Sequence, residues 1–541
     1  MTRVDQRPVD HAACSRVARP GFAAYSTTTR LPGSRDRSRP AGPRELHARR
    51  TASALALAVL LLGATAAAQP IPAHPSELTY ELLDFTPPVS ADHRHELSNG
   101  VVVFVVEDHE LPLATVGVTV RTGSYLDPPD KIGLAGLTGS QMRAGGTTTM
   151  SAADFDEEAA FLAAQIGSSI GATSGGASMN CLTRDLDACL DLFFDMLRNP
   201  GFDEDRLALA KSQALQQMER RNDATASIER REWARLMRGD AHFSTRPRTR
   251  ATVEAITRDD LAAFHREYYH PGNFIFTVSG DVDAAGILAE LERRLDGWDA
   301  GTTPVSPVPA PEFKPSPGLY LVDKEDVNQG RVAIGHLGTT RDNPDRYKLL
   351  VMNDILGGGG FSARLLTRVR SDEGLAYSAS SNYGLGTYYD GVFRAGFQSR
   401  SETVARATAI VLEEIARIRT EPVTDDELRN SIAYFVETFS RNFSSAASTA
   451  GLFAGDEYTG RDPSYLATYR ENIAAVTADD VLDVARRYLD PEALAILVVG
   501  NLEAILAGDP DRPEFSLEAL RAGEAVRIPL PDPFTMEYPA P

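Results

Sequence analysis

Short segments of the chain alternate between apolar and polar residues, and longer segments have a helical pattern. Val116, Val118 and Val120 are separated by single residues, which is typical of a half-buried strand. The Asn-Gly pair at 99–100 lies between two strand-like stretches and predicts a hairpin-type turn. Two long stretches predict helices: 202–221 and 425–439. Strands and helices of this kind in one chain predict an α+β fold.

A gap-free internal repeat divides the chain into two halves. Residues 256–283 and 476–503 align at an offset of 220. Each copy starts with a Thr and an acidic residue three positions later, which is the signature of a capping box at the start of a helix. Each copy ends in a β-branched strand that closes on Gly280 or Gly500. The repeat predicts two homologous domains, each a mostly antiparallel sheet with helices packed on one side. The identical pairs are Thr257/Thr477, Asp259/Asp479, Asp260/Asp480, Arg266/Arg486, Tyr268/Tyr488, Pro271/Pro491, Val278/Val498 and Gly280/Gly500.

Composition places the boundaries between these domains. The stretch 300–318 is rich in proline, which is typical of an extended and semi-rigid linker. The Pro-rich tail is expected to be extended and is given no role. The predicted order is an N-terminal extension with a signal peptide (1–68), an N-terminal segment (69–92), a first domain (93–299), the linker (300–318), a second domain (319–522) and the tail (523–541).

The first 68 residues have the pattern of a targeting segment. Arg49 and Arg50 precede an apolar run at 54–62, and a small-residue site ends at Ala68. We expect export to the periplasm or the outside with cleavage after Ala68, because the apolar run is too short for a comfortable membrane span. An uncleaved anchor is the alternative, and whether residues 1–48 are translated stays open.

Charge and cysteine content narrow the class of protein. The formal net charge is −20, and residues 1–68 carry 11 Arg against 4 acidic residues, so the chain that follows is near −27. Such an acidic surface argues against nucleic acid and anionic membranes as partners. Beyond the leader only Cys181 and Cys189 remain. Two buried thiols are favoured over a single bridge, which stays possible.

Two stretches of sequence resemble the pitrilysin/insulinase family of zinc metallopeptidases. The opening of the first domain reads "LSNGVVVFVVEDHELPLATVGVTVRTGSYLDPPDKIGLAGL" and is similar to the segment that leads into the catalytic helix of that family. The stretch "GGGGFSARLLTRVRSDEGLAYS" at 357–378 is similar to the signature of its second domain. The likeness runs in family order from about 93 to 503. It implies a half-clamshell architecture, as in family members built from two short chains.

The resemblance also implies that the zinc site has been lost. Where the family has His-x-x-Glu-His, this chain has Gly136, Gly139 and Ser140, and Ala210 stands where the family has a third ligand, a glutamate. A zinc site needs about three His, Glu or Cys ligands around one cavity. These degenerate positions offer none, so we expect neither a metal nor a catalytic residue in this chain.

Two pairs of histidines elsewhere are close in sequence. His93 and His95 are expected at a solvated edge before the first strand. His265 and His270 are expected to have a structural role, because the second copy of the repeat has no histidine at the matching positions.

Arg370 and Tyr377 match a residue pair that the family keeps in its second domain. The resemblance implies that the pair faces the zinc across a chamber and binds substrate: Tyr377 would donate a hydrogen bond to the scissile carbonyl, and Arg370 would bind a neighbouring carbonyl. The alternative is that Arg370 favours a helix C-terminus and Tyr377 is an ordinary strand residue. The glycines at 357–360 lack the Gly-Lys-Ser/Thr of a phosphate loop, which excludes nucleotide binding.

Together these features imply a non-catalytic, substrate-binding subunit of a two-chain zinc metalloendopeptidase acting on unfolded peptides. The zinc and the general base would come from a homologous partner with an intact His-x-x-Glu-His motif, and this chain would be inactive alone. An exported peptide-binding or scaffold protein of the same fold is the alternative. An enzyme with a replaced site has no support, because no nucleophile, base or metal set is clustered in the sequence.

Overall fold

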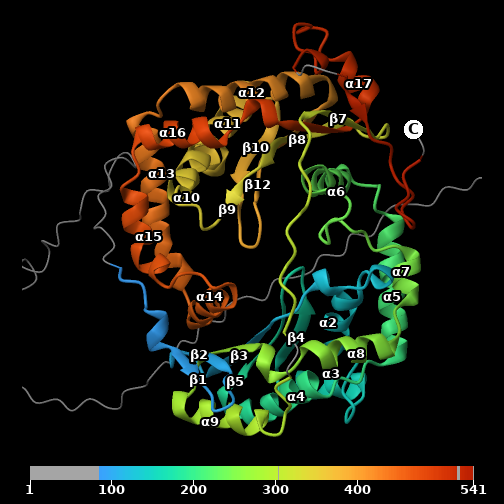
Figure 1. Ribbon diagram of the computed structural model, residues 1–541, viewed down its shortest axis with the longest axis vertical. Helices are drawn as coiled ribbons and strands as arrows, with labels where there is room; N and C mark the ends of the chain where they lie inside the picture. The colour runs from blue at the N-terminus through green and yellow to red at the C-terminus, as the bar shows by residue number, and fades with distance from the viewer. Residues whose placement is uncertain (1–84, 302–303, 521–523, 540–541) are drawn as a thin grey trace, which may run out of the picture. The chain divides into compact units, whose positions relative to one another are not determined.

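The computed structural model describes residues 85–301, 304–520 and 524–539. Within these ranges the chain forms two six-stranded mixed sheets with helices packed against them (Figure 1). None of the helices in this part of the chain has the length and apolar character that a membrane span requires. The predicted signal peptide at 1–68 lies outside the described residues.

The first sheet has the strand order β1-β2-β6-β3-β5-β4, and all of its neighbouring pairs are antiparallel except β2 with β6. Its strands are β1 (Arg94–Glu96), β2 (Val102–Glu107), β3 (Leu113–Val120), β4 (Gln165–Ile170), β5 (Gly175–Leu182) and β6 (Phe274–Gly280). The helices of this half are α2 (Leu134–Ala144), α3 (Ala152–Phe161), α4 (Leu186–Arg198), α5 (Glu204–Glu219), α6 (Thr225–Arg238), α7 (Arg250–Ala255), α8 (Arg258–Tyr268) and α9 (Ala284–Leu295).

The second sheet has the order β10-β12-β8-β13-β7-β14, in which β13 and β14 pair in parallel with β7 and the other pairs are antiparallel. Its strands are β7 (Gly318–Asp323), β8 (Gln329–Leu337), β10 (Ala376–Tyr383), β12 (Val392–Arg400), β13 (Ala495–Gly500) and β14 (Val526–Arg527), and a separate short parallel pair is formed by β9 (Thr339–Thr340) and β11 (Leu385–Gly386). The helices of this half are α10 (Arg346–Asn353), α11 (Arg364–Leu366), α12 (Val404–Thr420), α13 (Asp425–Thr438), α14 (Ala446–Thr459), α15 (Ser464–Ala474), α16 (Ala478–Tyr488) and α17 (Leu502–Ala507).

The two halves share one topology, which confirms the predicted duplication. The order β2-β6-β3-β5-β4 in the first sheet corresponds to β7-β13-β8-β12-β10 in the second, with the same parallel and antiparallel pairings. The repeated segments contribute α8 with β6 and α16 with β13. Thr257 and Thr477 both form capping boxes, with Asp260 and Asp480 as the reciprocal partners. The two copies of the sequence repeat therefore occupy equivalent positions in the two halves.

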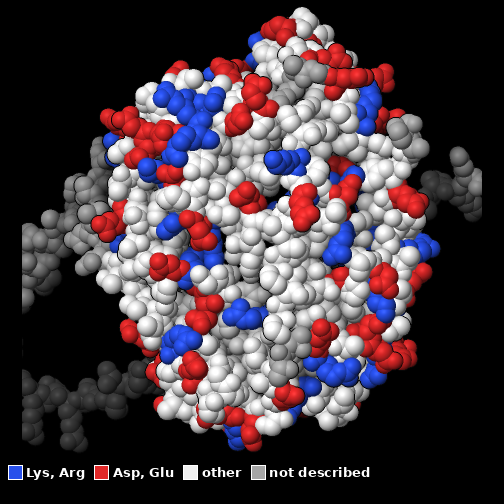
Figure 2. All heavy atoms as spheres, viewed as in Figure 1, with Lys and Arg blue, Asp and Glu red and all other residues white. Residues whose placement is uncertain are grey.

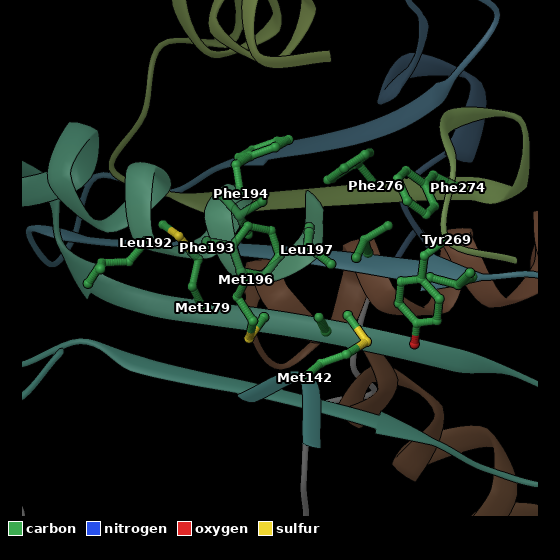
Figure 3. Packing of buried hydrophobic residues seen from close by; sticks show 14 of the residues in the cluster. Met142, Met179, Leu192, Phe193, Phe194, Met196, Leu197, Tyr269, Phe274 and Phe276 are labelled. Atoms are coloured by element: carbon green, nitrogen blue, oxygen red, sulfur yellow. The ribbon is translucent and has the colours of Figure 1, made fainter. Parts of the chain in front are cut away.

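The first core lies between the sheet and the helices on one of its faces. Val103 and Val105 of β2 are buried there together with apolar residues of α2, α4 and α8. Figure 3 shows Met142 of α2 together with Phe193 and Met196 of α4 among the labelled residues of this core. Burial of these side chains supplies the main driving force for folding this half.

Each sheet also has a second apolar face, which a helix of the other half covers. Both halves belong to a single unit that spans Leu83–Pro541. Phe104 of β2 points away from the first core and packs with Phe453 of α14, with ring centroids 6.0 Å apart. In the second sheet, Leu497 of β13 packs on the face where Trp233 of α6 lies. The expectation that helices pack on one side of each sheet was therefore incomplete, because α6 and α14 cross over to the sheet of the opposite half.

The C-terminal tail, which was given no role from the sequence, also joins the halves. The Ile528 amide donates to the carbonyl of Leu321 in β7, at 2.8 Å. Further along, Phe534 packs against the α5 and α7 helices, and the Tyr538 hydroxyl lies 2.8 Å from a carboxylate oxygen of Glu232 in α6. The tail thus runs from the second sheet to helices of the first half.

We predict that the crossing helices contribute strongly to stability. Phe453 is 1% exposed, so Phe453→Ala should lower the free energy of unfolding by about 3–5 kcal/mol, the usual cost of removing a buried Phe side chain. Phe161 is 82% exposed, and Phe161→Ala is the matched control, which should change stability by no more than about 0.5 kcal/mol. Urea unfolding of both variants checks this. Equal effects of the two substitutions would contradict a structural role for α14.

Candidate functional site

The helix at the degenerate zinc positions is firmly anchored. At its start, the buried carboxylate of Asp127 accepts hydrogen bonds from the backbone amides of Gly133 and Ala135, each at 2.8 Å. At its other end, Arg143 donates to the carbonyl of Ile166 in β4 at 3.1 Å and pairs with Asp156 at 2.7 Å. Helix α2 is therefore fixed against the edge strand β4, in a defined position rather than a loosened one.

Gly139, at the predicted place of the general base, is packed too closely for any side chain. A methyl group added to it would lie 2.3 Å from the backbone nitrogen of Ile170 and 2.7 Å from the carbonyl carbon of Ser169. The Ser168 hydroxyl donates to the Gly139 carbonyl at 2.7 Å. The space that a glutamate would occupy is therefore filled by the backbone of β4.

The other degenerate positions have different surroundings. Gly136 is exposed and has open space around it, and Ser140 is also exposed, with its hydroxyl donating to the Leu137 carbonyl at 3.1 Å. Ala210 lies on α5, which packs against α2, and is partly buried beside the first core. Among the residues that the structure describes, no group of three or more His, Cys, Asp or Glu side chains is arranged to hold a metal ion.

One histidine of each sequence pair, His93 and His265, lies in structural contacts. His93 precedes the first strand as expected, whereas the same expectation for His95 was wrong, because His95 lies within β1 (Arg94–Glu96). The His93 ring lies 3.0 Å from the Val105 carbonyl and stacks on Phe453. His265 is buried against the Leu197 carbonyl at 2.8 Å, and burial lowers its pKa to about 4.

Cys181 and Cys189 are both buried free thiols in this structure. Burial raises the pKa of each thiol above its usual value, so both side chains stay protonated.

Arg370 and Tyr377 lie side by side on the second domain. Arg370 is in a π-helical turn, η9 (Thr367–Asp372), that continues α11, and its guanidinium carbon is 4.7 Å from the centre of the Tyr377 ring. After this turn the backbone changes direction at Gly374, whose φ of +62° suits a residue without a side chain. Strand β10 then begins at Ala376. Within the described part of the chain Arg370 has no ion pair or hydrogen bond of its side chain, so its donors are free to bind another molecule.

A β-bulge turns Tyr377 outward. Between Ala376 and Ala379 the pairing of β10 with β12 shifts by one residue. Both alanines are buried on the core side, whereas Tyr377 between them is 82% exposed. Bulges redirect single side chains at sheet edges in this way. The result is a phenol hydroxyl presented to solvent beside a free guanidinium.

Phe361 completes this group and was missed in the sequence. It lies in the short turn η8 (Gly360–Ser362), and its ring centre is 5.0 Å from the Arg370 guanidinium carbon. It is 79% exposed, so Arg370 lies against two exposed aromatic rings. A lone aromatic residue directly after the glycines at 357–360 was the only signal available. We call Phe361, Arg370 and Tyr377 the aromatic–arginine cluster.

Comparison with known protein families identifies two matching regions in this chain. Residues 102–244 match Insulinase (Peptidase family M16), and residues 255–434 match the Peptidase M16 inactive domain. The chain belongs to the insulinase (M16) family of peptidases. The first match contains Gly136, Gly139, Ser140 and Ala210, and the second runs from the last elements of the first half into the second half, where it contains the aromatic–arginine cluster.

Relatives and solved structures agree with this assignment. An uncharacterized zinc protease, YmxG, of Bacillus subtilis is 25% identical over 346 residues, which cover 62% of this chain and 81% of the relative. A non-peptidase homolog of Helicobacter pylori is 24% identical over 411 residues, which cover 74% and 92%. The fold is similar to that of the peptidase M16 inactive domain from Pseudomonas fluorescens, with a TM-score of 0.67 and 23% identity over 75% of this chain and 97% of that one. The solved structure shows the fold, and the match of 255–434 to the Peptidase M16 inactive domain indicates a non-catalytic, M16-like protein.

The contact at Gly139 predicts that alanine substitutions at two glycines of α2 change the free energy of unfolding in opposite directions. Gly139→Ala should lower the free energy of unfolding by about 1–3 kcal/mol, because the added methyl group would overpack against the backbone of β4. Gly136→Ala should raise it by about 0.5–1 kcal/mol, because alanine restricts the unfolded chain and meets open space in the helix. Chemical denaturation of both variants is the measurement. A stabilising Gly139→Ala would show that β4 does not fill this space.

Proposed function

We propose that this chain is the substrate-binding subunit of a two-chain zinc metalloendopeptidase that acts on unfolded peptides. The partner is a homologous M16 chain that supplies the zinc and the general base. The observation that carries the proposal is the contrast between the two halves: backbone of β4 fills the space beside Gly139, whereas Tyr377 is exposed next to a half-buried Arg370 whose donors have no partner among the described residues.

The proposed chemistry divides between the subunits. Zinc in the partner would activate water and polarise the scissile carbonyl. In this chain, the Tyr377 hydroxyl would donate a hydrogen bond to the oxygen as negative charge develops on it, and Arg370 would bind a neighbouring carbonyl of the peptide backbone. A free guanidinium and a phenol are both donors, which suits a peptide backbone whose carbonyls need partners.

Variants of the reconstituted pair test these roles. Tyr377→Phe removes one hydroxyl and should lower kcat by roughly 10²–10³, the usual cost of one oxyanion donor. Arg370→Ala should act mainly on KM, because it would hold the backbone in the ground state and the transition state alike. Tyr434, on α13 and 53% exposed, provides the control Tyr434→Phe, which should leave both constants unchanged.

The measurement is steady-state cleavage of an unstructured peptide, with a pull-down to confirm equal assembly of every variant with the zinc-bearing partner. Wild-type kcat and KM in both assembled variants would make the pair structural. A scaffold protein of the same fold would then account better for the chain.

We also propose that the chain works outside the cytoplasm after removal of residues 1–68. The pattern of arginines, apolar run and alanines at 49–68 supports this step. N-terminal sequencing of the protein from the cell envelope should find a chain that begins at Gln69. An intact leader on protein from the soluble cytoplasmic fraction would contradict export.

A further inference from the structure

A cavity of about 530 Å³ lies between the crossing helix α6 and the edge of the second sheet. Helix α6 contributes one wall, and β8, β10 and β12 contribute the other. The strand β10 that lines the cavity at Ser380 and Asn382 is the same strand that presents Tyr377. Three residues of a strand span about 10 Å, so the cavity lies within reach of a peptide bound at Tyr377.

The cavity is strongly basic in a chain that is acidic overall. Its walls hold Arg230 and Arg238 from α6, Arg331 from β8 and Arg394 from β12, against a single acidic residue, Glu229. The whole chain has 75 acidic and 55 basic residues, and the face in Figure 2 shows the two signs intermixed. A cleft that gathers one sign of charge attracts ligands of the opposite sign.

One buried carboxylate, that of Glu229, pairs with two of the four arginines. Glu229 is 4% exposed and accepts from two guanidiniums, with Arg331 Nε at 2.8 Å from one oxygen and Arg394 on the other. Arg331 also donates to the side-chain oxygen of Gln398 at 3.0 Å. A single negative charge cannot neutralise two positive ones, so the fixed pair keeps an excess positive charge at the cavity wall.

The remaining two arginines have no acidic partner. Neither Arg230 nor Arg238 forms an ion pair with any residue that the structure describes. Arg238 lies against the Tyr389 ring, 5.6 Å from its centre, and its buried Nε has no hydrogen-bond acceptor. Donors left unpaired at a cavity are a cost to the folded protein unless a ligand provides the acceptor.

Apolar side chains line the rest of the cavity. Trp233 and Met237 of α6 and Val392 of β12 lie among the charged groups. The lining therefore suits a group that carries negative charge next to an apolar side chain. Guanidiniums form paired hydrogen bonds with a planar carboxylate, which is the anion that peptides carry.

We infer that this cavity binds a carboxylate of the peptide that lies along Tyr377, either its C-terminal carboxylate or the side chain of an acidic residue about three positions away. This inference rests on the proposed peptide-binding function and adds a preference for negatively charged peptides to it.

Binding of three fluorescent peptides to the full-length chain tests this inference. All three have a blocked N-terminus and share one flexible, uncharged parent sequence. The first has a free C-terminal carboxylate, the second is amidated and contains one Glu, and the third is amidated with Gln in place of that Glu. Fluorescence anisotropy measures each Kd. We expect the first or the second peptide, or both, to bind at least about tenfold more tightly than the third, because hydrogen bonds between charged groups are worth that much.

The variants Arg230→Gln and Arg394→Gln should remove this advantage and leave the binding of the third peptide unchanged. Arg400 lies on the same strand as Arg394 and is paired with Glu402 at 3.3 Å, so Arg400→Gln is the matched control and should change nothing. Circular dichroism confirms that each variant is folded.

The outcomes separate this inference from the function on which it rests. Equal binding of all three peptides, or the same loss in Arg400→Gln as in Arg230→Gln, would overturn carboxylate recognition while peptide binding stands. No binding of any peptide to the chain or to its complex with the zinc-bearing partner would overturn both.

Discussion

The packing of one helix from each half onto the sheet of the other is the interaction on which the rest of the structure depends. Both sheets are apolar on two faces, and local helices cover only one of them. Helix α6 covers the open face of the second sheet and α14 that of the first. Because exposed apolar faces are costly, neither half can bury all of its apolar surface alone. The same crossing forms one wall of the basic cavity, so the stability of the protein and its proposed ligand binding share one contact.

The helix at the predicted degenerate positions is also held by local contacts. Helix α2 is held by Asp127 at its start and by Arg143 near its end, and neither contact involves a metal ligand. At Gly139 the backbone of β4 lies in the space that a side chain would occupy, and the Ser168 hydroxyl donates a hydrogen bond to the Gly139 carbonyl. The helix is thus held by packing and hydrogen bonds alone, and a side chain at position 139 would need β4 to shift.

The repeat and the fold class could be predicted from the sequence and are confirmed, because each leaves a local signal. The structure also places Arg370 and Tyr377 side by side, and their substrate-binding role stays a prediction. The Thr caps and closing glycines of the repeat act within a few residues, and they led to the matching places of β6 and β13 in the two sheets. The crossing of α6 and α14 could not be read in this way, because an amphipathic helix does not specify which sheet it covers. The same holds for the basic cavity, whose arginines come from 230 to 394 in the sequence and meet only through that crossing. Phe361 was missed because its contact with Arg370 depends on the turn that brings the two residues together.

The central claim is that this chain supplies substrate-binding groups and no zinc to an enzyme completed by another chain. The most direct test is a titration of the purified chain into a fixed amount of a zinc-bearing M16 partner, with peptide cleavage and bound zinc measured at each ratio. The account predicts no cleavage and no stoichiometric zinc in this chain alone, and activity that rises to a plateau at equal amounts of the two chains and disappears with a chelator. One tightly bound zinc per molecule of this chain with chelator-sensitive cleavage in the absence of the partner would contradict it.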